Sequence, residues 1–362
     1  MSNHWPKNSE DFLNLTGIDI PIIQAPMAGG PSSPLLVSAV SNAGGLGSIG
    51  GGYLSPEVLE AQVSDVKSKT DKPFGVNLFI TNKGKNEIKP NSEIEKKISG
   101  YAEELGVELT GNTVPFPDFE KQLEVVVENN VNVFSFTFGI PDKKYIDRLK
   151  QNHTLIVGTA TSVNEAVKLQ NAGCDCIVAQ GFEAGGHRGS FDYQDNIPLV
   201  GSISLLPQIA DKIDIPLIAS GGIMDGRGIF ASFSLGASAV QMGTAFLTCE
   251  EAEVNQSWID LLLESNDTSS ALTNAFTGKF ARGINNRFMK ELKPLEDKIP
   301  EYPTQHQLTR DLRAKAKELN NTDFMSFWAG QGSAMCRLIR AEDLIKKLIM
   351  EYQEVELIMK KE

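Results

Sequence analysis

Eight short apolar segments alternate with segments of helical periodicity, and this alternation constrains the fold more than any other feature of the chain. Apolar runs of strand length that are separated by helices are typical of parallel sheets, whose strands are covered by helices on both faces. The expected strands occupy residues 21–27, 46–50, 73–80, 133–139, 154–160, 176–181, 216–222 and 239–247. Eight such units predict a closed (β/α)8 TIM barrel of the α/β class.

An open, doubly wound sheet is the competing topology, because periodicity alone does not distinguish it from a barrel. Residues 45–50 read Gly-Leu-Gly-Ser-Ile-Gly and match the G-x-G-x-x-G dinucleotide fingerprint letter for letter. In that fingerprint the glycines follow a strand and open a helix. Here a helix is expected before the glycines and a strand begins within them, so we do not interpret them as a nucleotide site.

Two regions differ in amino-acid composition from these repeating units. Residues 81–117 are polar and rich in Lys, Glu and Asn, and residues 249–321 carry acidic and amide-rich helical stretches. We expect residues 249–321 to form a second, smaller, mostly helical domain on the substrate side, with residues 81–117 as a candidate addition to it. The barrel is then expected to comprise residues 1–80, 118–248 and 322–362. A helix over residues 338–359 is expected to close it.

Composition excludes several classes of partner. The chain of 362 residues has a net charge of −12, which argues against nucleic acid or an anionic membrane as its main partner. The four cysteines form no C-x-x-C motif and no zinc spacing with histidine, so we expect free thiols and no metal site. No apolar run approaches the roughly 18 residues of a membrane helix. The start of the chain lacks the apolar core of a signal peptide, and we expect a cytoplasmic protein.

The segment 177–190 carries the clearest chemical signal. It is a short apolar run followed by a loop with glycines at 181, 185, 186 and 189, and the loop holds His187 beside Arg188. Glycine permits a positive φ and lets a flat ligand lie against the main chain. Histidine titrates near neutral pH. The loop therefore predicts one base placed over a planar group, and the alternative is a glycine-rich turn with a solvated histidine.

Two further loops indicate a phosphate site. In TIM barrels the ligand lies at the carboxyl ends of the strands, with phosphate held after the seventh and eighth strands. These positions are residues 220–228, which lead into a helix amino terminus whose free N–H groups favour phosphate, and residues 241–244, where Thr244 adds a hydroxyl. With no Walker A motif and no paired acidic metal site, a cofactor with one phosphate and a planar ring suits the chain, and FMN is such a cofactor. The amides of Gln24, Asn77 and Gln180, near other strand ends, suit the edge of an isoalloxazine ring or a ribityl chain.

These segments together resemble the nitronate monooxygenase family, formerly called 2-nitropropane dioxygenases. The resemblance spans nearly the whole chain, and its most specific block is Glu-Ala-Gly-Gly-His-Arg-Gly-Ser-Phe at residues 183–191. The matching segments are residues 24–27, 44–50, 75–77, 181–191, 220–228, 241–244 and 278–288.

The resemblance implies an FMN-dependent enzyme that detoxifies alkyl nitronates, such as propionate 3-nitronate. It would oxidise them with O₂ to carbonyl compounds and nitrite or nitrate, without metal or nicotinamide, and His187 would be the catalytic base. The expected FMN contacts are Gln24, Ala25, Pro26, Met27, Asn77, Gln180, Gly185, Gly186, Gly221, Gly222, Gln241, Met242, Gly243 and Thr244. The expected substrate contacts are Arg188, Lys279 and Tyr302, and a surface ion pair is the alternative for Arg188.

Two other functions stay open at this point. A flavin-dependent enoyl-acyl-carrier-protein reductase has a similar Gly-Gly-His loop but requires a nicotinamide site, and the long region 249–321 fits it less well. A non-catalytic flavin-binding protein is the second alternative. The position of His187 in its loop argues against that alternative, because a storage protein needs no base there.

Overall fold

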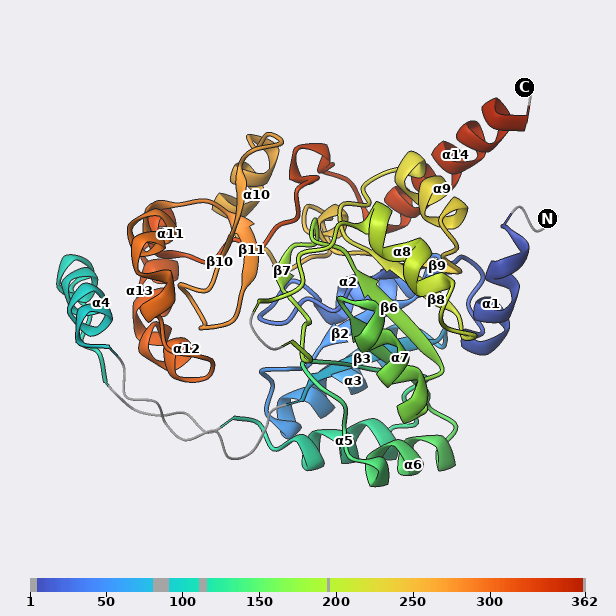
Figure 1. Ribbon diagram of the computed structural model, residues 1–362, viewed down its shortest axis with the longest axis horizontal. Helices are drawn as coiled ribbons and strands as arrows, with labels where there is room; N and C mark the ends of the chain where they lie inside the picture. Colours follow the sequence, from blue (N-terminus) through green and yellow to red (C-terminus); the bar gives the residue numbers. More distant parts are fainter. Residues whose placement is uncertain (1–4, 81–90, 111–115, 194–195, 361–362) are drawn as a thin grey trace.

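A closed ring of eight parallel strands forms the centre of the molecule (Figure 1). The computed structural model describes residues 5–80, 91–110, 116–193 and 196–360. The sheet runs in the order β1-β9-β8-β6-β5-β4-β3-β2. Its strands are β1 (Ile22–Gln24), β2 (Gly47–Gly50), β3 (Phe74–Phe79), β4 (Val133–Thr137), β5 (Leu155–Ala160), β6 (Cys176–Gln180), β8 (Leu217–Ser220) and β9 (Ala239–Met242).

Leu46, directly before β2, closes the ring against β1. Its N–H donates to the carbonyl of Ile22 at 3.0 Å, and its carbonyl accepts from the N–H of Gln24 at 2.9 Å. A parallel bridge between Ile23 and Leu46 completes the contact. The prediction of a TIM barrel is therefore confirmed, and the open doubly wound sheet is wrong.

Helices cover the outside of the ring. They are α2 (Pro34–Asn42), α3 (Pro56–Lys69), α5 (Phe119–Glu128), α6 (Lys143–Gln151), α7 (Val163–Ala172), α8 (Ser202–Ala210), α9 (Gly226–Ser234) and α14 (Ala341–Lys360). Ser33 and Ser55 cap α2 and α3 by accepting N–H bonds, and a proline follows each cap where its missing N–H costs nothing. The expected helix over residues 338–359 is α14, whose buried face joins the same hydrophobic core as α2 and α9. In the described part of the chain, no helix has both the length and the apolar character needed to span a bilayer.

A short helix that the sequence pattern did not indicate, α1 (Glu10–Thr16), fills one end of the barrel. Its Phe12 is fully buried and clusters with inward-facing strand residues that include Ile23 and Val133. This apolar plug occupies the amino-terminal end of the strands. The opposite, carboxyl end of the strands borders a larger cavity.

The glycines of the G-x-G-x-x-G sequence serve close packing. A Cβ at Gly47 would lie 2.1 Å from the carbonyl oxygen of Val37, and a Cβ at Gly45 would lie 2.7 Å from that of Ile22. Both separations are shorter than any van der Waals contact, so only glycine lets α2 pack this closely on the sheet. This packing agrees with the prediction that residues 45–50 are not a nucleotide site.

A second group of elements, which we call the outer layer, covers the carboxyl-terminal end of the barrel (Figure 1). It contains a three-stranded antiparallel sheet and helices that share a separate hydrophobic core. The sheet consists of β10 (Ser270–Thr273), β11 (Ala281–Ile284) and β7 (Gly186–His187), and the helices are α4 (Ser92–Leu105), α10 (Gln256–Leu263), α11 (Arg287–Leu292), α12 (Thr304–Leu308) and α13 (Arg310–Glu318). Short 3-10 helices are η1 (Lys7–Ser9), η2 (Thr244–Phe246), η3 (Lys293–Lys298), η4 (Thr322–Phe324) and η5 (Ser333–Met335).

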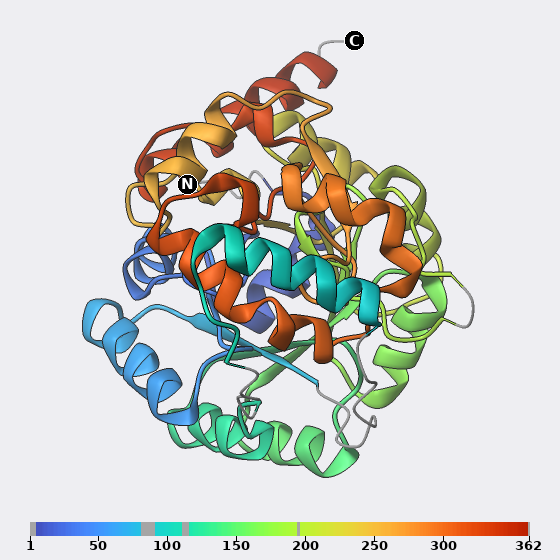
Figure 2. The ribbon, with the colours of Figure 1, turned by 90° about the vertical axis from the view of Figure 1, so that its left-hand side faces the viewer.

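The expectation for residues 249–321 was mostly helical, and the small sheet is an addition to it. Of the polar insert at 81–117, residues 81–90 and 111–115 lie outside the described residues. Its described helix α4 lies across the orange helices of the outer layer (Figure 2) and contributes Ile94 and Ile98 to their core. The exact domain boundaries stay a prediction.

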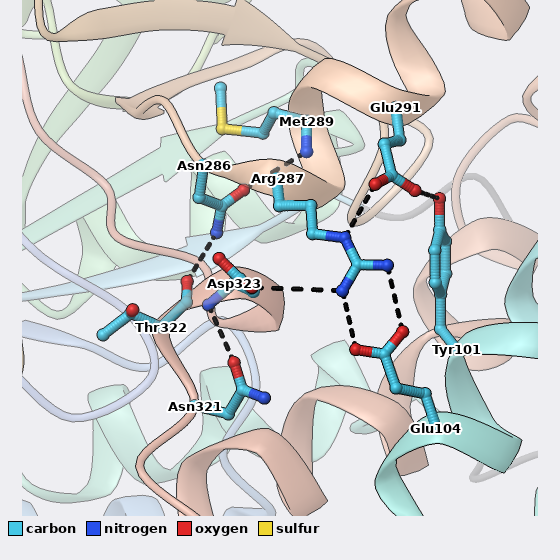
Figure 3. Close-up of polar contacts among 9 residues, drawn as sticks. All are labelled: Tyr101, Glu104, Asn286, Arg287, Met289, Glu291, Asn321, Thr322 and Asp323. Atoms are coloured by element: carbon cyan, nitrogen blue, oxygen red, sulfur yellow. Dashed lines mark hydrogen bonds and ion pairs between the residues drawn. The ribbon is translucent and has the colours of Figure 1, made fainter.

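Arg287 of α11 connects α4 to the rest of the outer layer through a network of charged hydrogen bonds (Figure 3). Its Nη1 and Nη2 donate to the two carboxylate oxygens of Glu104 at 2.6 and 3.0 Å, and its Nε donates to Glu291 at 2.7 Å. The Tyr101 hydroxyl donates to the second oxygen of Glu291 at 2.8 Å. A two-point contact between guanidinium and carboxylate is geometrically specific, so the network sets the orientation of α4.

Candidate functional site

A cavity of about 1140 Å³, including its open mouth, lies where the barrel strands end and the outer layer begins. Many of the residues that we expected at a cofactor site line it. These residues are Ala25, Pro26, Met27, Asn77, Gln180, Gly185, Gly186, His187, Gly221, Gln241, Gly243 and Thr244. Its lining mixes aromatic and aliphatic side chains with a few polar groups, as small-molecule sites do.

Six of the expected residues do not line the cavity. They are Gln24, Gly222, Met242, Arg188, Lys279 and Tyr302. Sequence reasoning also missed aromatic residues of the cavity wall, which are Tyr53, Phe79, Phe138, Trp258 and Trp328. The aromatic side chains come from segments that are distant in the sequence, so no local pattern pointed to them.

His187 is placed on the cavity wall by its strand. β7 pairs with β11, so that His187 lies opposite Ala281, and the imidazole Nε2 lies 2.9 Å from the Thr277 Oγ1. The imidazole also contacts the rings of Phe138 and Trp328, with centroids 6.0 and 5.3 Å away. Backbone pairing, one hydrogen bond and two aromatic neighbours thus restrict the ring to one orientation.

The surroundings of His187 keep its imidazole neutral. Burial, followed by the neighbouring Lys279, His306 and Arg313, lowers the pKa of His187 to about 3. Both causes act in the same direction, because a buried site and nearby positive charge each disfavour the imidazolium. Near neutral pH the side chain therefore has an unprotonated nitrogen that can accept a proton.

Gln180 holds the histidine loop with both ends of its amide. Its Nε2 donates to the His187 carbonyl at 2.9 Å, and its Oε1 accepts from the Gly189 N–H at 2.8 Å. The side chain also borders the cavity. Gln180 therefore holds the loop in place through two hydrogen bonds, and each polar atom of its amide has a partner within the protein.

Arg188 points into the protein, where it holds the start of the same loop. Its Nη1 donates to the carbonyls of Gln180 at 3.0 Å and Gly181 at 2.6 Å, and its Nη2 donates to Pro198 at 3.1 Å. Burial lowers its pKa to about 10, so it stays protonated near neutral pH. The structure does not place this guanidinium where it could contact a substrate in the cavity, contrary to our expectation.

Glu165 holds the far end of the loop and was not singled out as a site residue. The fully buried carboxylate accepts from the N–H groups of Phe191 at 2.6 Å and Asp192 at 3.0 Å. Its other oxygen accepts from the N–H and the hydroxyl of Thr161. The Glu165 N–H donates to the hydroxyl of Ser162, the residue that caps α7. The Glu165 carboxylate itself bonds to Thr161 and to Phe191 and Asp192, and it thereby holds the histidine loop.

The expected phosphate site keeps its glycines but loses the helix terminus. Gly221 and Gly222 have φ values of 117° and 71°, which only glycine adopts without strain. The N–H groups of Arg227 and Gly228 at the start of α9 donate to the Asp225 carboxylate. Because that helix end is already satisfied and next to a negative charge, the expectation that it receives a phosphate is wrong.

Among the amides expected near the cofactor, Gln24 and Asn77 have different surroundings. Gln24 is fully buried, accepts from the Ser48 N–H at 3.0 Å and donates to the Ser32 hydroxyl at 2.9 Å. Asn77 borders the cavity and donates to the Ser135 hydroxyl at 2.9 Å. Gln24 therefore connects segments of the barrel, whereas Asn77 faces the cavity.

Lys279 and Tyr302 do not line the cavity and lie behind its aromatic side chains. The Lys279 Nζ lies 4.4 Å from the ring centroid of Phe138, which lines the cavity. Tyr302 packs edge-on against His306 at 5.9 Å, and His306 stacks on Tyr53 of the wall. Lys279 therefore contacts a residue of the cavity wall directly, whereas Tyr302 is linked to the wall through His306.

The low pKa values of two histidines predict a dependence of stability on pH. Burial also lowers the pKa of His306 to about 3, so between about pH 3 and 6.5 the unfolded chain binds protons that the folded chain does not. The free energy of unfolding should therefore fall as the pH drops from about 6.5 to about 5. The free energy of unfolding, measured with urea at several pH values, should change less steeply with pH for His306→Phe than for the natural chain. The difference in slope should correspond to about one proton. Equal slopes would contradict the burial of His306 as a neutral group.

Comparisons with known proteins agree on one family. A family model described as nitronate monooxygenase matches residues 11–351. A probable nitronate monooxygenase of Staphylococcus aureus (strain JH9) is 42% identical over 356 residues, which cover 97% of this chain and 99% of the relative. The structure of nitroalkane oxidase from Streptomyces ansochromogenes matches with a TM-score of 0.90 and 36% identity, covering 96% of this chain and 99% of that one. FabK from Thermotoga maritima matches with a TM-score of 0.78 and 29% identity, covering 97% and 98% of the two chains. The chain therefore belongs to the nitronate monooxygenase family.

Proposed function

We propose that this protein is an FMN-dependent nitronate monooxygenase that oxidises alkyl nitronates, such as propionate 3-nitronate, with O₂. The products are carbonyl compounds and nitrite or nitrate. The observation that carries the proposal is the neutral imidazole of His187 on the wall of a cavity at the carboxyl ends of the barrel strands. Membership of the family supports the reaction type.

The cavity suits FMN because part of its wall is bare backbone. Gly186 has a φ of 73°, and a Cβ at this position would meet no atom within 4 Å, so open space lies directly against the main chain. A flat ring can occupy such a space. Gly185, Gly186 and Asn77 would hold the ring, and Gly221, Gly243 and Thr244 the phosphate end. When bound, FMN supplies electron transfer from the nitronate to O₂, which is chemistry of the cofactor itself.

His187 would act on the α-carbon of a nitroalkane. Such a compound is a weak carbon acid, and the imidazole, which is neutral near pH 7, has a free nitrogen lone pair that can take the proton. The C–H bond breaks, the proton goes to the imidazole, and the electron pair moves to the nitro group, which becomes a nitronate. The resulting imidazolium and the nitronate carry opposite charges, so each stabilises the other in a site with little water.

The charges beyond the aromatic wall also favour an anionic ligand. Arg313 donates to neutral acceptors, the Thr309 hydroxyl at 3.1 Å and the His306 carbonyl at 3.1 Å. It lowers the pKa of His187, as Lys279 does. Although the net charge of the chain is −12, the charged side chains that lower the pKa of His187 are basic. This local field supports a nitronate substrate, and one with an additional carboxylate above all.

One anaerobic titration tests the function against its alternatives. Purified protein loaded with FMN is titrated while the flavin absorbance is followed. Bleaching by propionate 3-nitronate supports the proposal. Bleaching by NAD(P)H alone would instead favour a flavin-dependent enoyl-acyl-carrier-protein reductase, and no bleaching by either compound would favour a non-catalytic flavin-binding protein.

Filling the space beside Gly186 should weaken cofactor binding. In Gly186→Leu the side chain would project into space next to the main chain of the cavity, so we expect the Kd for FMN to rise by at least about tenfold. Gly106→Leu is a matched control, because Gly106 has a similar φ of 63°, also meets no atom within 4 Å and ends α4 in the outer layer. Both positions have a left-handed φ, so a leucine is strained at either one. FMN fluorescence quenching gives the two Kd values, and equal values would count against this placement of FMN.

A further inference from the structure

Thr277 is the residue whose side chain makes the hydrogen bond to the imidazole of His187. It lies between β10 and β11, is 2% exposed, and its Oγ1 is 2.9 Å from the His187 Nε2. Neither the sequence motifs nor the expected site residues included it. Its position ninety residues further along the chain explains why no local pattern connected the two side chains.

The Lys279 main chain gives the Thr277 hydroxyl proton an acceptor other than the imidazole. The Lys279 N–H lies 3.3 Å from Oγ1 and can only donate to it. The Lys279 carbonyl lies 3.2 Å from Oγ1 and can only accept from it. A hydroxyl has one proton and two lone pairs. With its proton on the Lys279 carbonyl and one lone pair on the Lys279 N–H, Oγ1 has one lone pair left for His187.

With the hydroxyl proton on the Lys279 carbonyl, the remaining lone pair of Oγ1 pairs only with a donor, and this arrangement selects a tautomer. Near neutral pH the imidazole carries one proton, on either Nδ1 or Nε2. A hydrogen bond to the remaining lone pair of Oγ1 forms only when that proton is on Nε2. The other ring nitrogen, Nδ1, then has a free lone pair.

We propose that Thr277 is a positioning residue that holds His187 in the Nε2–H tautomer and leaves Nδ1 to accept the α-proton of a nitroalkane. This inference rests on the proposed function for the identity of the proton donor. In the step, the α-C–H bond breaks, the proton goes to Nδ1 and the electron pair becomes part of the nitronate. The Nε2–H bond to Thr277 is kept throughout, so the hydroxyl does not reorganise as the imidazolium forms.

Nitrogen-15 NMR of the full-length protein tests the tautomer independently of any activity. The chain has four histidines, so histidine-selective labelling gives few signals, and a His187→Asn sample assigns those of His187. We expect a protonated Nε2 and an unprotonated Nδ1 near neutral pH. In Thr277→Val the two tautomers should mix, and in Thr277→Ser the pattern of the natural chain should return. A proton on Nδ1 in the natural chain would overturn the proposal.

Kinetics on two substrates test the consequence. Thr277→Val should lower kcat for neutral nitroethane on the order of tenfold, because the ring is no longer held for proton abstraction. The rate with preformed ethyl nitronate should change little, and Thr277→Ser should restore the loss. Thr273→Val is the matched control, since Thr273 is also buried, lies on the same segment and accepts from the Ala275 N–H instead. Equal losses in Thr277→Val and Thr273→Val would refute the positioning role.

The two measurements separate this inference from the proposed function. If NMR shows the Nε2–H tautomer but neither nitro substrate is turned over by the natural chain, the proposed function fails and the tautomer assignment stands. If both substrates are turned over but Thr277→Val affects neither the tautomer nor the rate, only the role of Thr277 is refuted.

Discussion

Replacing His187 with Asn should lower turnover of neutral nitroalkanes by on the order of 10²–10⁴-fold while FMN stays bound. Asparagine keeps a polar group near Thr277 but cannot take a proton near neutral pH, so only the base is removed. Preformed nitronates have already lost the α-proton, and their oxidation should suffer much less. Steady-state kinetics on nitroethane and ethyl nitronate, with the flavin spectrum recorded for each preparation, measure both effects.

His306→Asn is the appropriate control for this experiment. His306 has the same lowered pKa of about 3 but lies behind Tyr53 and does not line the cavity. Its replacement should leave the ratio of the two rates close to that of the natural chain. If His187→Asn slows both substrates by the same factor, His187 is not the base, and another role for the imidazole must be sought.

Replacing Arg188 with Met should cause the largest loss of stability. Three carbonyls, at Gln180, Gly181 and Pro198, would lose a charged donor inside the protein, and each unsatisfied buried group costs about 1–3 kcal/mol. The negative charges of Glu165 and Glu183, which favour the Arg188 cation, would also lose their counter-charge. We expect the free energy of unfolding to fall by about 3–5 kcal/mol, measured by urea denaturation.

Arg340→Met provides the comparison for the Arg188 variant. The Arg340 side chain is 57% exposed and forms a 3.5 Å ion pair with Glu342, so its loss should change stability by less than about 1 kcal/mol. A substrate-binding role for Arg188 predicts a different result, in which KM for nitronates rises and stability is kept. That outcome would show that the buried hydrogen bonds of Arg188 do not account for its presence beside the histidine.

The fold was predictable from the sequence because each of its units is local. A strand of a parallel barrel is a short apolar run, and glycine, serine and proline mark where its helix begins and ends. The strand limits were less accurate. The expected strand at residues 239–247 ends at Met242, where the chain turns into η2 to form one side of the cavity. β7 was missed because two residues in a glycine-rich loop become a strand only when β11 pairs with them.

The site was only partly predictable for a related reason. The rule that ligands lie at the carboxyl ends of barrel strands identified Asn77, Gln180 and Gly243, which do line one cavity. The same rule assigned Gln24 to the cavity, where the structure places it in the barrel wall. Strand position determines the end of the barrel on which a side chain lies. Whether its polar atoms face a ligand depends on the neighbouring segments.

The sequence by itself determined eight alternating strand–helix units, which favour a barrel, and a glycine-rich histidine loop after the sixth strand. Periodicity and glycine placement are properties of neighbouring residues, and they act before distant segments meet. Only the tertiary structure decided that Arg188 turns inward, that Glu165 holds the loop and that Thr277 contacts the histidine. A buried hydrogen-bonding group pairs with whichever partner folding brings within about 3 Å, and sequence distance places no limit on that partner.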